Sequence, residues 1–221
     1  MRFTKTVKYN YTLTEETLEK DIEGFIGKAR RGNYSWDYKY DGEGLKIIKQ
    51  YFRILNDKFK NEEYQECKVC YEKLILFLFD ASSGKDKADF GYEDLLARIT
   101  NDFDKYIKNY FICLVKTCDT EELADRVSKY VQNLDIYGFE SDISSLSEKL
   151  DSLMLDNLEK RMLIKTEGMT KKDYQKHALI YFLMDLAKKR GYKEKYSQLC
   201  ENFRGILSEE EIKENIESYD E

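Results

Sequence analysis

Proline is absent from the 221 residues, although at a usage of about 5% a chain of this length would carry roughly eleven prolines. Proline-rich linkers, proline-dependent ligand segments and cis-proline turns are therefore excluded. Helices have to end through Gly, Asn or another capping residue instead. The 11 glycines are scattered singly and match no phosphate-binding loop; Ser82-Ser83-Gly84-Lys85 comes nearest, but it follows an apolar helical pattern and lacks a second Gly.

Long apolar runs are also missing. The longest, residues 74–79, is far shorter than the roughly 20 residues that span a bilayer. The amino-terminal sequence MRFTKTVKYNYTLT lacks the apolar stretch of a secretory signal. Five cysteines, an odd count, within helical patterns argue against a disulfide framework. We therefore expect a cytoplasmic protein with no membrane partner.

Charge and hydrophobicity indicate a folded, acidic protein. Hydrophobic residues make up 42% of the chain, enough for a core despite a charged fraction of 36%. The net charge is −6 and the isoelectric point about 5.2. Because phosphate contacts need clustered positive charge, a nucleic-acid partner is unlikely on this composition.

Hydrophobic periodicity predicts an all-α fold of antiparallel helical hairpins, with a minor amino-terminal β element. Residues 3–13 and 34–40 alternate with period 2, as strands do. The rest of the chain follows the helical period. The sequence divides into extended segments plus a first helix (1–44), a helical-repeat-like domain (45–205) and an acidic carboxy-terminal helix (206–221). The helical patterns lie near residues 18–29, 45–59, 64–81, 92–99, 103–114, 119–131, 141–163, 170–191 and 196–203, and a last short acidic helix starts at Ser208.

Residues 45–80 resemble a tetratricopeptide-type (TPR-like) repeat. Aromatic, Leu and small residues recur on two helices joined by a short turn, and a looser copy covers 174–205. Asn61 stands where the family pattern has Gly, Leu74 replaces a small residue, and the terminal Pro is absent. The matching residues are Tyr51, Leu55, Tyr64, Cys67 and Tyr71. The resemblance implies stacked α-hairpins, either a short solenoid or an irregular bundle, and a groove that binds peptides.

Two groups of residues are candidates for metal or nucleophilic chemistry. Cys67 and Cys70 form the only CxxC, and Cys113 with Cys118 would complete a four-thiolate zinc site. All four lie in apolar helical faces, where cysteine usually packs as a small hydrophobe. His177, the sole histidine, is interpreted as a core residue hydrogen-bonded to a neighbour. We therefore expect no metal and no cofactor.

Two further groups are candidate partner-binding sites. The first is an aromatic ladder that serves either as a stacking or strand-accepting surface or as apolar cover for the first helices: Tyr34, Trp36, Tyr38 and Tyr40. The second is basic, in a segment (165–195) with nine Lys or Arg against four Asp or Glu: Lys171, Lys172, Lys176, Lys188, Lys189 and Arg190. It would bind an acidic peptide, unless the acidic carboxy-terminal segment covers it.

The favoured interpretation is a non-catalytic helical scaffold that binds a protein or peptide partner. Helical architecture suggests this only by analogy. The alternatives are an enzyme or nucleic-acid-processing factor with a carboxylate-based site, and a helical segment of a larger protein. A homodimer that pairs the amino-terminal strands is also possible.

Overall fold

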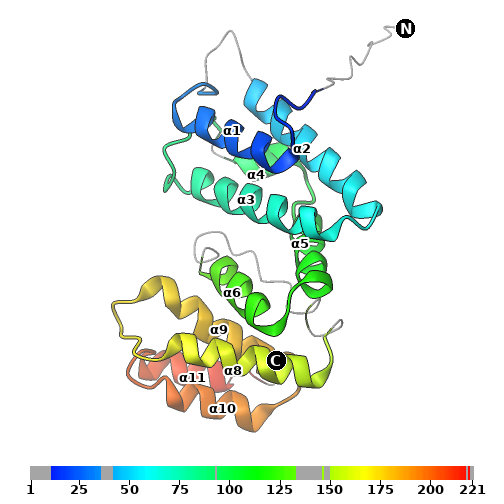
Figure 1. Cartoon of the computed structure of the whole chain (residues 1–221). Helices are drawn as coiled ribbons and strands as arrows, with labels where there is room; N and C mark the ends of the chain where they lie inside the picture. Colours follow the sequence, from blue (N-terminus) through cyan, green and yellow to red (C-terminus); the bar gives the residue numbers. More distant parts are fainter. Residues whose placement is uncertain are drawn as a thin grey trace, which may run out of the picture. The chain divides into compact units, whose positions relative to one another are not determined.

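The computed structural model describes residues 11–35, 42–92, 94–132, 146, 150–217 and 219, without the side chains of 174–176. These residues form ten helices and no β-strand, which confirms the all-α fold class (Figure 1). The chain divides into two compact units, Met1–Tyr110 and Phe111–Glu221. The division falls inside one helix, within the range 45–205 that the sequence analysis treats as one domain. Each unit is described by itself.

The described residues do not show the predicted amino-terminal β element. Residues 11–13 and 34–35, the described parts of the two alternating segments, are not in strands. Residues 3–10 and 36–40 lie outside the described residues. Tyr11 instead packs as an anchor, with its hydroxyl group 2.7 Å from the Asp21 carboxylate. Of the alternating aromatic residues, the described Tyr11 and Tyr34 place their rings against Tyr51 and Phe25.

Unit 1 is built around one central helix. The helix α3 packs against both α1 and α2, and α4 contacts α2 and α3. The helices are α1 (Leu18–Arg30), α2 (Glu43–Lys60), α3 (Tyr64–Ser82), α4 (Leu95–Ile99) and the first half of α5 (Asp104–Thr117). These bounds agree closely with the periodicity, because each helix buries one regularly spaced apolar face.

Aromatic rings fill much of the core of unit 1. Phe25 stacks on Tyr34 with a centroid separation of 4.7 Å, and Phe52 stacks on Tyr106 at 4.0 Å. Gly44 in α2 allows a close approach, since a Cβ there would lie 2.9 Å from both the Phe90 ring and the Tyr34 side chain. Offset stacking and edge contacts of this kind stabilise a core beyond simple burial of apolar area.

Unit 2 is a series of helices in which neighbours along the chain pack together. The helix α8 contacts α6 and α9, α9 contacts α10, and α10 contacts α11. The bounds are α6 (Thr120–Val131), α8 (Ser152–Thr166), α9 (Tyr174–Lys189), α10 (Lys193–Asn202) and α11 (Glu209–Glu217). The central helix α9 contacts α6 as well and is buried on most sides.

The helix predicted at 141–163 is interrupted in the described residues, because Leu146 is helical, residues 150 and 151 are not, and α8 runs from Ser152 to Thr166. At the start of α8 the Asp151 side chain accepts a hydrogen bond from Met154 N at 2.8 Å. This is a conventional N-cap, which satisfies one of the free amides of the first turn. Residues 141–145 and 147–149 lie outside the described residues.

Capping signals in the sequence mark three helix starts. Asp119 accepts from Glu121 N and Glu122 N at the start of α6. Ser208 and Glu211 form a reciprocal capping box before α11, with each side chain bonded to the other's amide. The third signal acts differently: Thr170 donates to the Asp173 carboxylate, and Asp173 makes no side-chain bond to the first turn of α9.

The hairpins α2–α3 and α9–α10 share one turn. Three residues join each pair, and the middle one is left-handed: Glu62 at φ 63° and Gly191 at φ 71°. The amide of Glu62 donates to Phe59 O, and that of Gly191 donates to Lys188 O, both at 3.0 Å. The two copies therefore have the same backbone geometry although their sequences differ. The position that requires a left-handed residue is 62, not Asn61, whose φ is −84°.

Candidate functional site

The helix α8 exposes two large aliphatic side chains on its outer side. Leu153 is 69% exposed and Ile164 is 61% exposed, the highest values among the large hydrophobic residues of the described chain. They are eleven residues apart, close to three full helical turns, so they project in nearly the same direction. The opposite side of the helix is buried through Leu155, Leu158 and Met162.

Leu153 does not lie on the buried face of this helix, although it belongs to the apolar pattern of 141–163. Leu155, Leu158 and Met162 follow the 3–4 spacing of a buried face, and Leu153 is off that spacing by nearly half a turn. The interval between Leu153 and Ile164 was the signal available in the sequence. It identifies a second, outward stripe on the same helix, which we call the α8 outer face: Leu153, Asp156, Asn157, Lys160, Arg161 and Ile164.

Ion pairs with α6 fix the rotation of α8 about its axis. Lys165 Nζ lies 2.5 Å from Asp125 Oδ1, and Arg161 Nη1 lies 3.4 Å from Glu121 Oε2. Each of these side chains is at least partly exposed, so each pair contributes little to stability by itself. Together with the buried apolar side, they hold one surface of α8 outward.

A buried ion cluster ties α8 to the α9–α10 turn. Arg190 Nη1 lies 2.8 Å from Asp156 Oδ1 and 3.5 Å from Glu159 Oε2. Lys195 Nζ lies 2.6 Å from Glu159 Oε1. The side chains of Arg190 and Glu159 are only 7% and 3% exposed. Because buried charges need close partners, this cluster constrains α8, α9 and α10 in one arrangement.

The predicted basic binding face does not form as one surface. Arg190 is buried in the ion cluster, and Tyr192 covers its guanidinium with a ring centroid 4.5 Å from Cζ. Lys171 and Lys172 precede α9, whereas Lys188 and Lys189 occupy its last turn. A helix of 16 residues is about 24 Å long, so the two pairs lie at opposite ends. The side chain of Lys176 lies outside the described residues.

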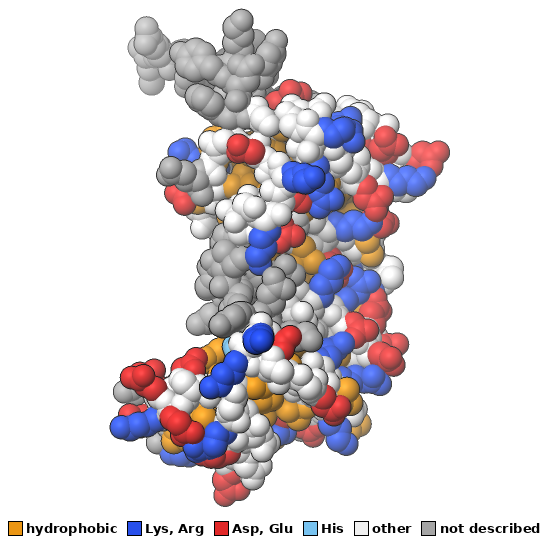
Figure 2. Space-filling model, turned by 90° about the vertical axis from the view of Figure 1, so that its left-hand side faces the viewer, with side chains coloured by type: hydrophobic (Ala, Val, Ile, Leu, Met, Phe, Trp, Pro, Cys, Tyr) orange, Lys and Arg blue, Asp and Glu red, His pale blue; other side chains and the backbone are white. Residues whose placement is uncertain are grey.

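The acidic carboxy-terminal segment packs on the helices that carry these lysines. Tyr181 of α9 donates a hydrogen bond to Glu211 of α11 at 3.0 Å. Tyr219 packs on Tyr196 with ring centroids 4.9 Å apart, and Lys188 Nζ lies 6.0 Å from the Tyr219 ring. Figure 2 shows Lys and Arg side chains interspersed with Asp and Glu on the face that it draws.

Of the predicted aromatic ladder, only Tyr34 lies in the described residues. Its ring stacks on Phe25 in the core of unit 1, which corresponds to the reading of this residue as apolar cover. Trp36, Tyr38 and Tyr40 lie outside the described residues.

The cysteines are buried, and His177 is not in the core. None of the five cysteines forms a disulfide bond; Cys67 and Cys70 lie in unit 1, and Cys113 and Cys118 lie in unit 2. Burial raises the pKa of the Cys70 thiol to about 12, so this thiol stays protonated. Within the described chain no three or more His, Cys, Asp or Glu residues are placed to hold a metal ion. His177 is partly exposed, with Nε2 3.4 Å from Thr170 O, so its prediction as a buried residue is wrong.

A hydrogen-bonded carboxylate lies inside unit 1. Asp21 is 2% exposed and accepts from the hydroxyl groups of Tyr11 and Tyr51, each at 2.7 Å. Thr14 donates through both its amide and its hydroxyl group. Burial opposes ionisation, but these donors together lower the pKa of Asp21, and burial raises the pKa of Tyr51. Sequence analysis missed this network because Asp21 sits among the apolar positions of α1.

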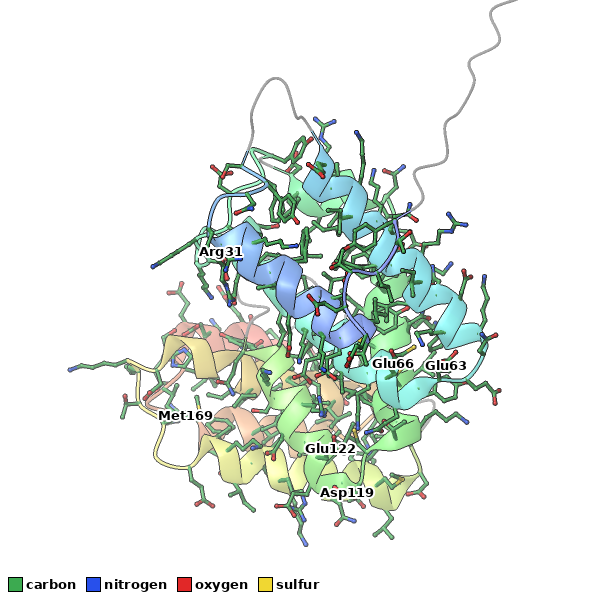
Figure 3. All side chains as sticks on the ribbon, turned by 45° about the horizontal axis from the view of Figure 1, so that its top comes forward. Arg31, Glu63, Glu66, Asp119, Glu122 and Met169 are labelled. Carbon is green, nitrogen blue, oxygen red and sulfur yellow. The ribbon has the colours of Figure 1, made fainter. Side chains whose placement is uncertain are left out.

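The α2–α3 turn carries a second acidic group. Lys58 Nζ lies 2.7 Å from both Glu63 and Glu66, which stand together at the start of α3 (Figure 3). The lysine lowers the pKa of Glu63. Figure 3 also shows Asp119 and Glu122 at the start of α6, where Asp119 is the N-cap and Glu122 pairs with Arg126 at 2.8 Å. Both groups are accounted for by capping and ion pairing.

No helix in the described part of the chain combines the length and hydrophobicity needed to cross a bilayer. The comparisons with known proteins returned no match: no family model, curated protein or solved structure resembles the chain significantly. The α8 outer face is therefore judged on its geometry alone.

Proposed function

We propose that this chain is a non-catalytic helical scaffold that binds a protein partner through the α8 outer face. The observation that carries this proposal is the exposure of Leu153 and Ile164 on one stripe of a rigidly held helix. Water contact with two large aliphatic side chains is unfavourable, and burial of such a side chain contributes about 1.5–3 kcal/mol. A partner that covers both gains that energy without reorganising the helix.

The surroundings of the two aliphatic side chains match the anatomy of a binding surface. Polar and charged side chains lie between and beside them: Asp156, Asn157, Lys160 and Arg161. Apolar anchors with a polar rim are typical of protein interfaces. The ion pairs to α6 and to Arg190 hold the anchors in fixed positions, which lowers the entropy cost of binding.

Most of the shifted carboxyl groups favour a scaffold over an enzyme with a carboxylate-based site. A general acid or base needs a pKa adjusted toward the working pH. The pKa values of Asp21, Asp86, Glu201 and Glu211 are instead lowered, by hydrogen bonds or ion pairs that hold the structure together. Burial raises the pKa of Asp80. The carboxylates with a lowered pKa are fixed partners of neighbouring helices and turns.

Two features support the placement of this scaffold among helical-repeat proteins of the cytosol. The shared turn of α2–α3 and α9–α10 is what a TPR-like array of α-hairpins would need, because repeats reuse one local geometry. The five buried cysteines form no disulfide bond, which suits a reducing compartment. Family membership and location are part of the proposal.

A pull-down with a matched control tests the proposal. The double variant Leu153→Ser/Ile164→Ser removes both anchors, and Ile216→Ser makes the same kind of change on the 38% exposed Ile216 of α11. We expect wild type and Ile216→Ser to recover the same partner, identified by mass spectrometry, and the double variant to lose it. Equal recovery by all three proteins would remove the α8 outer face from the proposal.

A further inference from the structure

Two of the three charges of the α8 outer face, those of Asp156 and Lys160, are arranged almost symmetrically about its centre. The midpoint between Leu153 and Ile164 falls between positions 158 and 159. Asp156 lies just before this midpoint and Lys160 just after it, on the same side of the stripe. If the helix direction is reversed about this midpoint, Leu153 and Ile164 exchange places. Asp156 and Lys160 exchange places in the same way.

We propose that the α8 outer face binds the same face of a second copy of the chain, with the two α8 helices antiparallel. This rests on the proposed function, and it names the partner. A two-fold axis perpendicular to both helices places Leu153 beside Ile164 of the second copy. The same axis brings Asp156 beside Lys160 of the second copy, with an offset of about 1.5 Å along the helix axis.

The charges select the antiparallel arrangement. In a parallel pair the two-fold axis would place Asp156 and Lys160 of the two copies on opposite edges of the contact, so that each Lys160 would face Arg161 of the second copy. Like charges in direct opposition are unfavourable, and such pairings set helix orientation in coiled coils. In the antiparallel pair two Asp156–Lys160 contacts form, one on each side of the centre. The two aliphatic contacts then close the ends of the interface.

The ion pairs inside the chain leave these groups able to bind. The Asp156 side chain remains 53% exposed although it pairs with Arg190. The Arg161 side chain remains 43% exposed although it pairs with Glu121, and Lys160 is exposed. The face presented by a single helix is smaller than a standard interface of about 1,600 Å². The association is therefore weak and visible only as the concentration rises.

A charge exchange tests this pairing in the full-length chain. We expect Lys160→Asp alone, and Asp156→Lys alone, each to weaken self-association at least about tenfold in sedimentation, because like charges then face each other twice. An equimolar mixture of the two variants restores it, since every contact again joins opposite charges. Lys171→Asp, the same charge change at an exposed loop residue, serves as the control. Circular dichroism checks the fold of Asp156→Lys, which also loses the pair with Arg190.

A second experiment does not depend on charge. Leu153→Cys and Ile164→Cys are purified separately, mixed and mildly oxidised, with wild type and its buried cysteines as the background. The antiparallel pair predicts a disulfide between the two variants, because position 153 of one copy lies beside position 164 of the other. The two copies of position 153 are about 16.5 Å apart along the helix axis, too far for a disulfide. Efficient cross-linking of Leu153→Cys with itself would overturn the antiparallel arrangement.

The two proposals fail in different ways. A wild-type chain that stays at its monomer mass at every concentration overturns the second copy as partner. If Leu153→Ser/Ile164→Ser then still loses a different protein in the pull-down, the proposed function stands. If neither self-association nor any other binding responds to the α8 outer face, both proposals fall.

Discussion

The hairpins α2–α3 and α9–α10 have the same turn and are stabilised in different ways. In α2–α3 the left-handed residue is Glu62, and the turn is closed by an exposed pair of acids around Lys58. In α9–α10 the left-handed residue is Gly191, and Arg190 extends from the turn into a buried ion cluster. Backbone hydrogen bonds determine the conformation of the turn, while its side chains determine which neighbouring helices it contacts. Only the second turn holds the helix that carries the proposed binding surface.

The largest expected effect is at Arg190. The variant Arg190→Ala leaves Glu159 buried with Lys195 as its remaining ionic partner. We expect a loss of about 3 kcal/mol in the free energy of unfolding of unit 2, as for other broken buried pairs. Urea unfolding followed by circular dichroism measures it.

The matched change in the other hairpin is Lys58→Ala. It removes the surface ion pairs of Lys58 with Glu63 and Glu66. We expect this loss to be close to the measurement error, because exposed ion pairs are screened by solvent. Equal losses at Arg190 and Lys58 would contradict the distinction between the two hairpins.

The next largest change in stability is expected in α2, at a position where α2 and α9, the first helices of the two hairpins, differ. Tyr51 in α2 donates to the Asp21 carboxylate, whereas Ile180 at the matching place in α9 is apolar. We expect Tyr51→Phe to destabilise unit 1 by about 2 kcal/mol at neutral pH, the usual contribution of a hydrogen bond to a charged group.

This difference should depend on pH. Folding lowers the pKa of Asp21 from its ordinary 3.8, so its contribution is complete above that pH and is lost as the pH falls through the folded-state value. The gap between wild type and Tyr51→Phe should therefore narrow below about pH 4. A gap that is constant from pH 7 to pH 2 would mean that Asp21 is not the relevant acceptor.

A smaller effect is expected at the left-handed glycine. An added Cβ at Gly191 meets no atom within 4 Å, so the change Gly191→Ala costs only backbone strain. We expect a loss of about 1 kcal/mol, measured as a decrease of a few degrees in the melting temperature. An unchanged melting temperature would show that position 191 does not need the left-handed conformation.

The reverse change in the other turn should have a small effect of opposite sign. Glu62 adopts φ 63°, which glycine tolerates better. Part of the relief is offset because glycine is more flexible in the unfolded chain, so we expect Glu62→Gly to stabilise unit 1 by about 0.5 kcal/mol. Differential scanning calorimetry of both glycine variants beside wild type tests the sign. Destabilisation here would indicate that the Glu62 side chain has its own stabilising contact.

The helices could be predicted well from the sequence and the exposure of individual side chains poorly, for physical reasons. Helix periodicity and caps are local, so α2, α3 and the starts at Asp119 and Ser208 could be read from the sequence. The predicted amino-terminal β element is not shown: Tyr11 contacts a buried carboxylate ten residues away, and residues 3–10 lie outside the described residues.

The candidate basic residues do not share one surface, for a different reason. Charge counts do not show that Lys171 and Lys188 lie at opposite ends of one helix or that Arg190 is buried. Likewise, the exposure of Leu153 depends on how α8 is rotated against α6 and α9, which is a tertiary property. These errors all concern which way a side chain faces once the helices have packed.

The α8 outer face is tested most directly by sedimentation equilibrium over a wide concentration range. We predict that the wild-type mass rises from 26.4 kDa toward twice that value, while Leu153→Ser/Ile164→Ser stays at the monomer mass. Circular dichroism spectra of the two proteins should coincide. A wild type and double variant that associate equally would contradict the account, because the exposed aliphatic stripe would then contribute nothing to binding.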